Sequence, residues 1–399
     1  MLALRVRKLA SVGAYPGGTS LVIPLLVGPW VSTSIYHVPL LSMHRSAVLT
    51  HNAPTGAYRG AGRPESICII ERLLDAAARE MALDGAELRR RNMFKPDQMP
   101  CTNAMAQVYD SGQFEKMLDQ GLLLSDWAGF DARRAATQAR GKLRGRGIAT
   151  FLERTGGNVL EENVRVDVTS DGFIELTSAT MAMGQGIATS YVQLAHDVFG
   201  VPLDRIRVLQ GDTDRANGFG SAGSRSLFTG GAAVRVASQK AVDEGKKLAG
   251  DALEGPAADI EYKAGRYTVA GTDLSIGLFD LAQRQGGGRL TVSASAAAAA
   301  PSWPNGCHVA EVEIDPATGE VQVVAYASVN DSRRVVSPTI VQGQVEGGAV
   351  QGIGQALCEQ LVYDADSAQL LSASFIDYVL PRVDKFRAFK TVFARVCRA

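Results

Sequence analysis

The spacing of apolar positions predicts helices and strands in mixed order from the beginning of the chain. Residues 46–50 are typical of a strand, and residues 54–62 form a loop rich in turn-forming residues. A helix is expected to begin with Pro64 at its first position, where the missing N–H of proline costs nothing. Apolar residues at helical spacing give this helix one buried stripe: Ile67, Ile70, Leu74, Ala77 and Met81.

Polar residues mark where the next helices should begin. Asp84 is placed to cap a short helix over residues 85–92, and Asp110 or Ser111 to cap a third helix. The polar stretch 125–140 favours a helical connection between domains.

Beyond residue 147 the pattern alternates, which predicts antiparallel hairpins. Residues 164–169 and 173–179 flank an Asp-Gly turn, and residues 309–314 and 321–328 flank a second turn. Further helices are expected over 186–199, 226–253 and 338–359. Further strands are expected over 206–210, near Leu361 and over 372–378. These elements predict an α+β class with mixed α/β domains.

The same pattern suggests four regions. We expect one domain over residues 1–124, a connection over 125–145, a second domain over 146–384 and an unpatterned basic tail over 385–399.

Composition limits the classes of binding partner that the sequence indicates. The 41 basic and 41 acidic residues cancel, so no nucleic acid or anionic membrane is indicated. The five cysteines are scattered without metal-site spacing, which favours a reducing compartment. The apolar run 20–31 contains two prolines and lacks a clear cleavage site, and no stretch is apolar enough to span a bilayer. A cytoplasmic protein is therefore expected.

Glycine is abundant, with 42 residues, and it concentrates in loops that precede predicted helices. Four such segments carry polar side chains: 57–64, 183–186, 220–226 and 343–352. A helix N-terminus attracts phosphate, glycine allows close backbone approach, and glutamine amides can both donate and accept. Each segment alone could be a tight connection, whereas the four together favour one large anionic heterocyclic ligand.

Other signals have simpler interpretations. Residues 218–223 satisfy the glycine pattern of dinucleotide-binding loops, but they do not directly follow a strand. His196 is interpreted as a packed or surface histidine, and Asp212 and Asp214 as residues that fix their loop by local hydrogen bonds. The arginine run 89–91 is interpreted as a solvated helix face.

Taken in order, these segments resemble the large subunit of molybdenum hydroxylases, the family of xanthine dehydrogenase, aldehyde oxidase and aerobic carbon monoxide dehydrogenase. The resemblance runs from about residue 2 to about residue 384 and includes Gly211-Asp212-Thr213-Asp214 and the stretch 307–319. It implies two molybdopterin-binding domains, of which the first is present as its second half and the second is truncated, so that the fold is incomplete at both ends.

The resemblance also implies which residues meet the cofactor. Gln185 resembles a glutamine that approaches an oxo ligand of molybdenum, within the segment Met183, Gly184, Gln185 and Gly186. The loop beneath the metal comprises Arg59, Gly60 and Ala61. The segment that grips the pterin and phosphate comprises Gly223, Ser224, Arg225 and Ser226, and Gln351 is a further pterin contact. The cofactor's dithiolene sulfurs hold the metal, so no protein metal ligands are expected.

The implied activity is hydroxylation of a carbon atom with oxygen from water. Electrons would leave through iron–sulfur and FAD partner chains, and the cofactor would be molybdopterin, alone or as its cytosine dinucleotide. Carbon monoxide dehydrogenases place a cysteine where this chain has Gly60, and purine-oxidising members place an aromatic residue where it has Ala61. An aldehyde or an N-heterocycle is therefore the expected substrate.

Two departures from the family qualify this expectation. The family's upstream half is absent, and its catalytic glutamate follows the part that matches residues 377–381, whereas residues 382–399 contain no glutamate. We expect the isolated chain to be inactive unless a further polypeptide supplies the missing halves. A non-catalytic homologue that serves as an assembly or binding partner, and an unrelated nucleotide-binding protein, are the alternatives.

Overall fold

The structure is a computed structural model that describes residues 1–157, 159–386 and 389–394. The chain divides into two compact units. Unit 1 comprises residues 1–153, 303–334 and 341–399, and unit 2 comprises residues 154–302 and 335–340. Of the tail expected over 385–399, residues 387–388 and 395–399 lie outside the described residues.

Unit 2 contains a four-stranded sheet in the order β12-β6-β7-β8. Its strands are β6 (Glu161–Thr169), β7 (Ile174–Ser178), β8 (Ile206–Leu209) and β12 (Arg289–Ala297). β6 and β7 pair antiparallel, so the predicted first hairpin is confirmed. β7 and β8 pair in parallel because helix α6 (Ile187–Phe199) carries the chain back between them.

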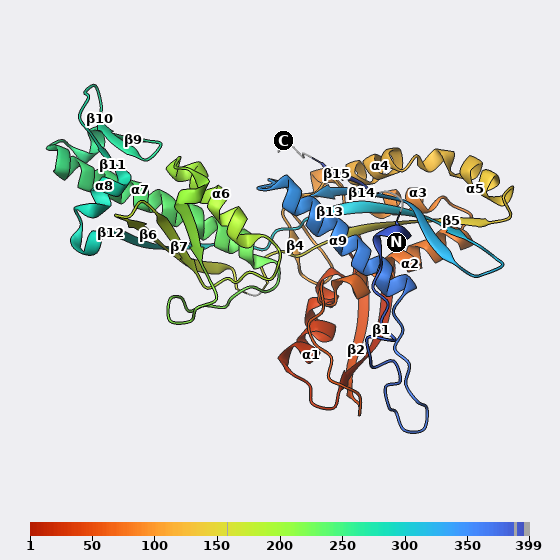
Figure 1. The fold of residues 1–399 in the computed structure, drawn as a ribbon. Coiled ribbons are helices and arrows are strands. Elements are labelled where there is room, and N and C mark those ends of the chain that lie inside the picture. Colours follow the sequence, from red (N-terminus) through yellow and green to blue (C-terminus); the bar gives the residue numbers. More distant parts are fainter. Residues whose placement is uncertain (158, 387–388, 395–399) are drawn as a thin grey trace. The chain divides into compact units, whose positions relative to one another are not determined.

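Helices α6 and α7 (Gly231–Leu253) pack with this sheet (Figure 1). Val234, Ala237 and Ala241 of α7 are buried in the core and Leu248 packs against it, and a π-helical turn, Ser226–Gly230, precedes the helix. Gly200 ends α6 in the left-handed conformation with a φ of 65°, as the sequence indicated. The apolar pattern did not predict β12, helix α8 (Leu278–Gln283) or a small sheet of β9 (Ile260–Lys263), β10 (Arg266–Val269) and β11 (Ser275–Gly277).

Unit 1 contains a second four-stranded sheet in the order β15-β14-β13-β5. Its strands are β5 (Leu143–Leu152), β13 (Asn305–Ile314), β14 (Val321–Asp331) and β15 (Phe389–Phe393). β13 and β14 pair antiparallel, which confirms the second hairpin. Helices α4 (Phe114–Leu124) and α5 (Phe130–Gln138) run along this sheet (Figure 1).

The rest of unit 1 includes a separate sheet of two parallel strands, β1 (Ala3–Gly13) and β2 (Leu40–Leu49). Short helix α1 (Gly18–Val22) lies between them in sequence, and β3 (Cys101–Thr102) pairs with β4 (Val108–Tyr109). Helices α2 (Arg63–Glu80) and α3 (Gly85–Asn92) follow β2. Asp84 caps α3 by accepting from the N–H groups of Ala86 and Glu87, as predicted.

Some expectations were wrong. Gln113 precedes α4 at the cap position, so neither Asp110 nor Ser111 caps this helix. The segment after α9 (Pro338–Leu357) forms turns and an isolated bridge between Tyr363 and Leu370 in place of the two predicted strands. Apolar residues near position 361 and over 372–378 are largely exposed there, so their periodicity reflected no buried sheet face.

The run of three arginines also differs from the prediction of a solvated face. Arg91 is exposed, whereas the Arg89 side chain is 0% exposed and bonds to Glu71 and Asp75. Successive residues of a helix point in different directions, so one of the three arginines, Arg89, is directed toward α2 and pairs with carboxylates there.

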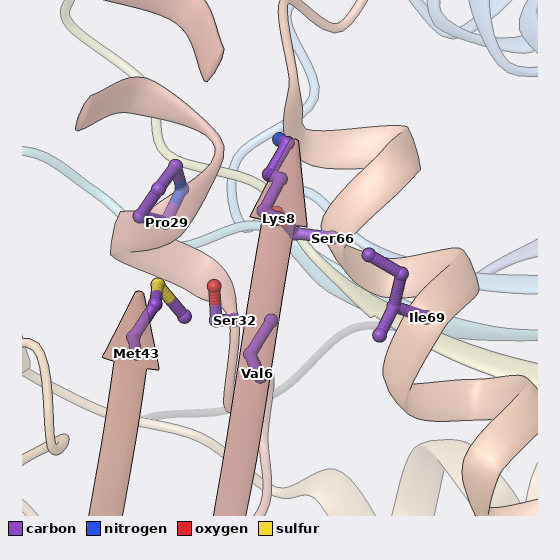
Figure 2. Close-up of a pocket in the computed structure, with 7 residues that line it drawn as sticks. All are labelled: Val6, Lys8, Pro29, Ser32, Met43, Ser66 and Ile69. Atoms are coloured by element: carbon purple, nitrogen blue, oxygen red, sulfur yellow. The ribbon is translucent and has the colours of Figure 1, made fainter. Parts of the chain in front are cut away.

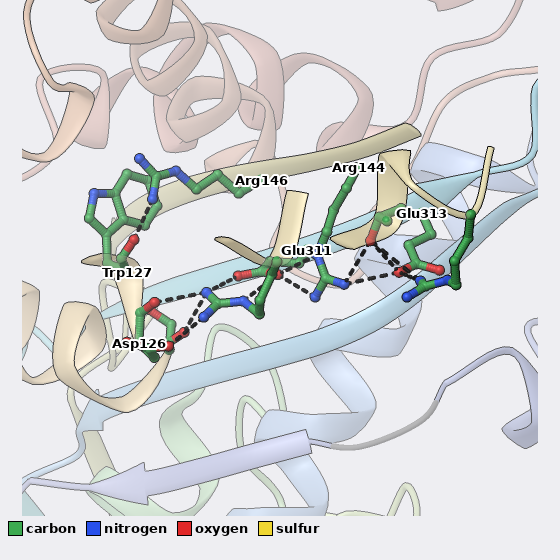
Figure 3. Close-up of polar contacts among 10 residues, drawn as sticks. Asp126, Trp127, Arg144, Arg146, Glu311 and Glu313 are labelled. Atoms are coloured by element: carbon green, nitrogen blue, oxygen red, sulfur yellow. Dashed lines mark hydrogen bonds and ion pairs between the residues drawn. The ribbon is translucent and has the colours of Figure 1, made fainter. Parts of the chain in front are cut away.

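Arginines of α5 and β5 form a dense polar network with β13 in unit 1 (Figure 3). Glu311 lies 2.6 Å from both Arg133 and Arg144, and Glu313 lies 3.0 Å from Arg144. Arg146 lies over the ring of Trp127, with its guanidinium carbon 3.6 Å from the ring centroid. The network joins the predicted connection, residues 125–145, to the sheet of unit 1.

Candidate cofactor-binding site

The loop 218–226 of unit 2 has a backbone that most residues could not adopt. Gly220, Gly223 and Ser224 have φ values of 80°, 58° and 60°, in the left-handed region that glycine tolerates best. A Cβ on Gly223 would lie 2.6 Å from the Cα of Gly157, so the backbones touch at this point. The exposed residues Ala222 and Ser224 lie on either side of that contact. The loop is therefore a fixed turn with small residues on its open surface.

Arg225 anchors this loop from within. Its side chain is 0% exposed, and its Nη1 lies 2.6 Å from Oε2 of Glu162. The guanidinium also donates to the carbonyl oxygens of Val159, Glu161 and Gly220. The Arg225 guanidinium, which was predicted to hold phosphate, is therefore bonded inside the protein. Contacts of residues 223–226 with a ligand would come from their backbone and from serine side chains.

Hydroxyl groups join this loop to the loop 181–186. Ser221 Oγ accepts from the N–H of Met181 at 2.9 Å and donates to its carbonyl at 3.0 Å. Ser226 Oγ donates to Ser221 Oγ at 2.7 Å, and the hydroxyl of Tyr191 donates to the Ser226 carbonyl at 2.7 Å. Burial raises the pKa of Tyr191 to about 12, so its hydroxyl keeps the proton that it donates. The two loops are therefore fixed together.

Gln185 lies between Gly184 and Gly186, whose φ values are 89° and 74°. Its Oε1 accepts from the N–H of Met183 at 2.5 Å, whereas its Nε2 makes only a long contact of 3.4 Å with the Met181 carbonyl. The oxygen is satisfied within the loop, and the amide N–H groups remain able to donate outward. Met183 is itself exposed.

In unit 1, the loop before α2 holds three consecutive left-handed residues. Gly60, Ala61 and Gly62 have φ values of 90°, 45° and 84°. A Cβ on Gly60 would meet the ring of Pro64 at 2.4 Å, so only glycine fits there. Ala61 adopts this conformation at a cost in free energy, because its Cβ crowds the backbone there. Arg63 begins α2 and pairs with Glu153 at 2.8 Å.

Arg59, in the same loop, lies against α9. Its Nη2 donates to the carbonyl of Gln344 at 2.8 Å and to the side chain of Gln344 at 3.3 Å. A Cβ on Gly348 would lie 3.5–3.8 Å from three guanidinium atoms, so the guanidinium rests on a helix face without side chains. Gln351 follows Gln344 by seven positions and therefore shares this face. Unit 1 thus brings Arg59 and the α9 stripe together.

Each unit fits an anionic, planar organic cofactor. The groups that can contact such a cofactor are backbone N–H groups, amides, hydroxyls and one exposed guanidinium. Neighbouring glycines leave the backbone accessible. Across the described part of the chain, no group of three or more His, Cys, Asp or Glu side chains could hold a metal ion. The donors suit a cofactor that brings its own metal ligands.

A small hollow in unit 1 is not part of this arrangement. Val6 and Lys8 of β1 and Met43 of β2 line it, together with residues near the start of α2 (Figure 2). Burial outweighs the attraction of Glu65 and lowers the pKa of Lys8. None of the predicted site residues is among those that line this hollow.

Sequence reasoning missed three residues of the site. Glu162 lies within an alternating strand, Tyr191 belongs to an apolar helix stripe, and Gln344 was noted only as part of a glycine-rich segment. The alternation of β6 offered one signal, because an acidic residue at an inward position needs a buried partner.

The fold and the loops define a cofactor-binding protein with two units, each presenting glycine-rich turns at helix starts. Sequence comparison identifies the family: the Molybdopterin cofactor-binding domain matches residues 120–387, and a second domain of that description matches residues 1–93. The chain belongs to the molybdopterin-binding family of molybdenum hydroxylase large subunits. This assignment confirms the resemblance and excludes an unrelated nucleotide-binding protein.

Characterised relatives agree. The nicotine 6-hydroxylase large subunit of Paenarthrobacter nicotinovorans is 32% identical over 96% of this chain and 49% of its own length. The carbon monoxide dehydrogenase large chain of Hydrogenophaga pseudoflava is 30% identical over 96% of this chain and 50% of its own. The crystal structure of quinoline 2-oxidoreductase from Pseudomonas putida 86 superposes with a TM-score of 0.90 and 30% identity, over 99% of this chain and 53% of that chain. The chain thus spans about half the length of the relatives it matches.

Among the described residues, no helix combines the length and apolar character needed to cross a bilayer.

Proposed function

We propose that this chain forms the molybdopterin-binding part of an oxidoreductase that hydroxylates an N-heterocycle or an aldehyde with oxygen from water. The observation that carries the proposal is the pair of glycine-rich loops, 181–186 and 218–226, fixed together within a region that matches the cofactor-binding family. When bound, the cofactor would supply the two-electron redox chemistry.

The residues of this chain would bind and orient the cofactor. Gln185 would donate from its amide to an oxygen of the cofactor, because its Oε1 is already satisfied within the loop. Exposed backbone N–H groups near Ala222 and Ser224 would receive the anionic tail. In unit 1, Arg59, which lies against α9, would present a guanidinium, and Gln351 of α9 would present an amide.

The substrate class rests on two positions and on the relatives. Gly60 provides no thiol for a copper ion, and Ala61 provides no aromatic ring for a purine to stack on. Nicotine and quinoline, after which two of the relatives are named, are N-heterocycles. These points favour an N-heterocycle, with an aldehyde as the second choice.

The complete activity would belong to a larger assembly. Because the chain spans about half of its relatives' length, we propose that further large-subunit sequence completes the cofactor cradle and supplies the catalytic base. A relative is named as the gamma subunit of a dehydrogenase complex, which supports separate iron–sulfur and FAD subunits. The cytosine dinucleotide form of the cofactor and a cytoplasmic location complete the proposal.

The test is to purify the chain from its own cells with the subunits that accompany it. Molybdenum, pterin and the CMP released by acid are then measured. Dye-linked oxidation is assayed with quinoline, nicotine, benzaldehyde, xanthine and carbon monoxide. Molybdenum with pterin, and turnover of the first three compounds, is the expected result. Molybdenum with pterin but no turnover of any compound would favour the non-catalytic homologue. A preparation without pterin would refute the proposal.

A further inference from the structure

The buried ion pair between Glu162 and Arg225 does more than stabilise unit 2. Arg225 follows a loop whose open surface carries small, exposed residues, yet its guanidinium is directed into the protein and donates to carbonyls of two separate segments. Glu162, on β6, contributes a carboxylate that is 4% exposed. An arginine can be buried at such a site only when its charge is compensated, and Glu162 compensates it.

The direction of these carbonyls fixes the direction of the neighbouring N–H groups. In a planar trans peptide unit, the C=O and the N–H point in opposite directions. The Gly220 carbonyl accepts from Arg225 at 2.7 Å, so the N–H of Ser221 points away from the guanidinium. The Gly223 carbonyl accepts from the N–H of Gly156 at 3.1 Å, so the N–H of Ser224 points away from Gly156.

These N–H groups are available to a ligand. Among residues 1–157, 159–386 and 389–394, no acceptor is recorded for the backbone N–H groups of residues 221–224. Ala222 and Ser224 are exposed, and Gly223 is held by its contact with Gly157. Successive backbone N–H groups without internal partners can form a concave site for an anion in such a turn.

We propose that Glu162 is a positioning residue for the anionic tail of the cofactor: it holds Arg225 inside unit 2, and Arg225 draws the Gly220 carbonyl inward, which turns the N–H of Ser221 outward, beside those of residues 222–224, to face the phosphate. The inference rests on the proposed function for the identity of the anion. Arg225 therefore acts through the loop, and its own charge does not reach the phosphate.

The experiment compares variants within the assembled protein. Replacing both partners, as Glu162→Met with Arg225→Met, removes the inward pull and leaves no unpaired buried charge, so unit 2 should stay folded. Glu162→Gln, which leaves the arginine charge uncompensated, should both lower the melting temperature and release pterin. The matched control is Asp167→Asn, a buried carboxylate on the same strand that pairs with Arg165 at 2.9 Å and, among the described residues, bonds to none of the loop.

Pterin content, measured by fluorescence after oxidation, is the first readout. The double variant should retain about tenfold less pterin than the parent at a similar melting temperature, because charge-assisted hydrogen bonds to phosphate are lost. Asp167→Asn should retain parental pterin even where its melting temperature falls. Parental pterin in the folded double variant would overturn the inference while leaving the proposed function intact.

Hydrogen exchange of the amides of residues 221–224 is the second readout, with inorganic pyrophosphate as the probe for protein stripped of pterin. Pyrophosphate should slow exchange in the parent and in Asp167→Asn but not in the double variant. Equal exchange with and without pyrophosphate in the parent would show that these N–H groups bind no anion, even if the assembly contains molybdopterin through other contacts.

Discussion

The Nε of Arg89 lies 2.7 Å from Oε2 of Glu71, and the two side chains are 0% and 5% exposed. The other carboxylate oxygen of Glu71 accepts from the hydroxyl of Tyr36 at 2.5 Å and from Thr150 at 2.9 Å. One buried carboxylate thus joins α2 to α3, to β5 and to the segment before β2. Because α2 begins directly after the loop of Arg59, this network sets the position of the unit 1 part of the site.

Removal of Glu71 should therefore destabilise unit 1 strongly. Glu71→Ala leaves the Arg89 charge buried without its main partner, and such changes typically lower the free energy of unfolding by about 3–5 kcal/mol. Denaturant unfolding followed by tryptophan fluorescence measures the effect. Arg91→Ala is the control. Among the described residues this exposed arginine pairs only with Glu87, so its loss should change the free energy of unfolding by less than about 1 kcal/mol. Equal effects of the two substitutions would contradict the prediction.

Gln185→Ala should leave the fold intact and weaken the function of the assembled protein. Loss of an amide that orients a cofactor oxygen typically reduces activity or affinity by ~10–100-fold. Turnover, pterin content and the molybdenum spectrum are the measurements. Gln239→Ala, on α7, removes an exposed amide that bonds only to Asp243 in the described structure and should leave all three unchanged. An unaltered spectrum in Gln185→Ala would mean that this loop is only a connection.

The effect of a substitution at Gly348 should depend on the size of the new side chain. A Cβ there would make ordinary contact with Arg59 at 3.5 Å, so Gly348→Ala should be tolerated, whereas the branched side chain of Gly348→Val should displace the guanidinium. A charged hydrogen bond contributes about 1.5–3 kcal/mol, so the valine variant should lose the cofactor at least about tenfold faster. Gly352→Val is the control, since a Cβ there meets nothing within 4 Å. Parental retention in Gly348→Val would show that Arg59 needs no such support.

Unit 1 should become less stable in acid, because the Glu311 carboxylate then loses its charge. Burial by itself would raise the pKa of this carboxyl, but hydrogen bonds and charges from Arg133 and Arg144 overcome it, so the pKa lies below its ordinary value. A carboxylate with a depressed folded-state pKa contributes stability above its unfolded pKa of about 4.3, and that contribution is lost as pH falls through the folded value.

Urea unfolding between about pH 6 and pH 3 tests this prediction. The fall in unfolding free energy should be shallower in Glu311→Gln, which has no such charge to lose. Glu244→Gln, which removes an exposed partner of Lys247, should follow the parent. Parallel curves for Glu311→Gln and the parent would contradict the assignment.

The sequence by itself determined the local elements and the family. Both hairpins, the cap at Asp84 and the end of α6 at Gly200 follow from patterns spanning a few residues, because turns and caps are made by neighbouring groups. Local hydrogen bonds were expected in the loop of Asp212 and Asp214 for the same reason, and Asp212 accepts there from the N–H of Asp214 and from Arg215. The glycine loops and their order along the chain carried the resemblance that the family match confirms.

Tertiary structure alone decided where the charged side chains point. Arg225 meets Glu162 at a separation of 63 residues, and Arg59 meets Gln344 at a separation of 285. The parallel pairing of β1 with β2 and the burial of Arg89 likewise depend on segments brought together by folding. An arginine has the same appearance in a sequence whether it is solvated or buried, because what buries it is a distant carboxylate that compensates its charge.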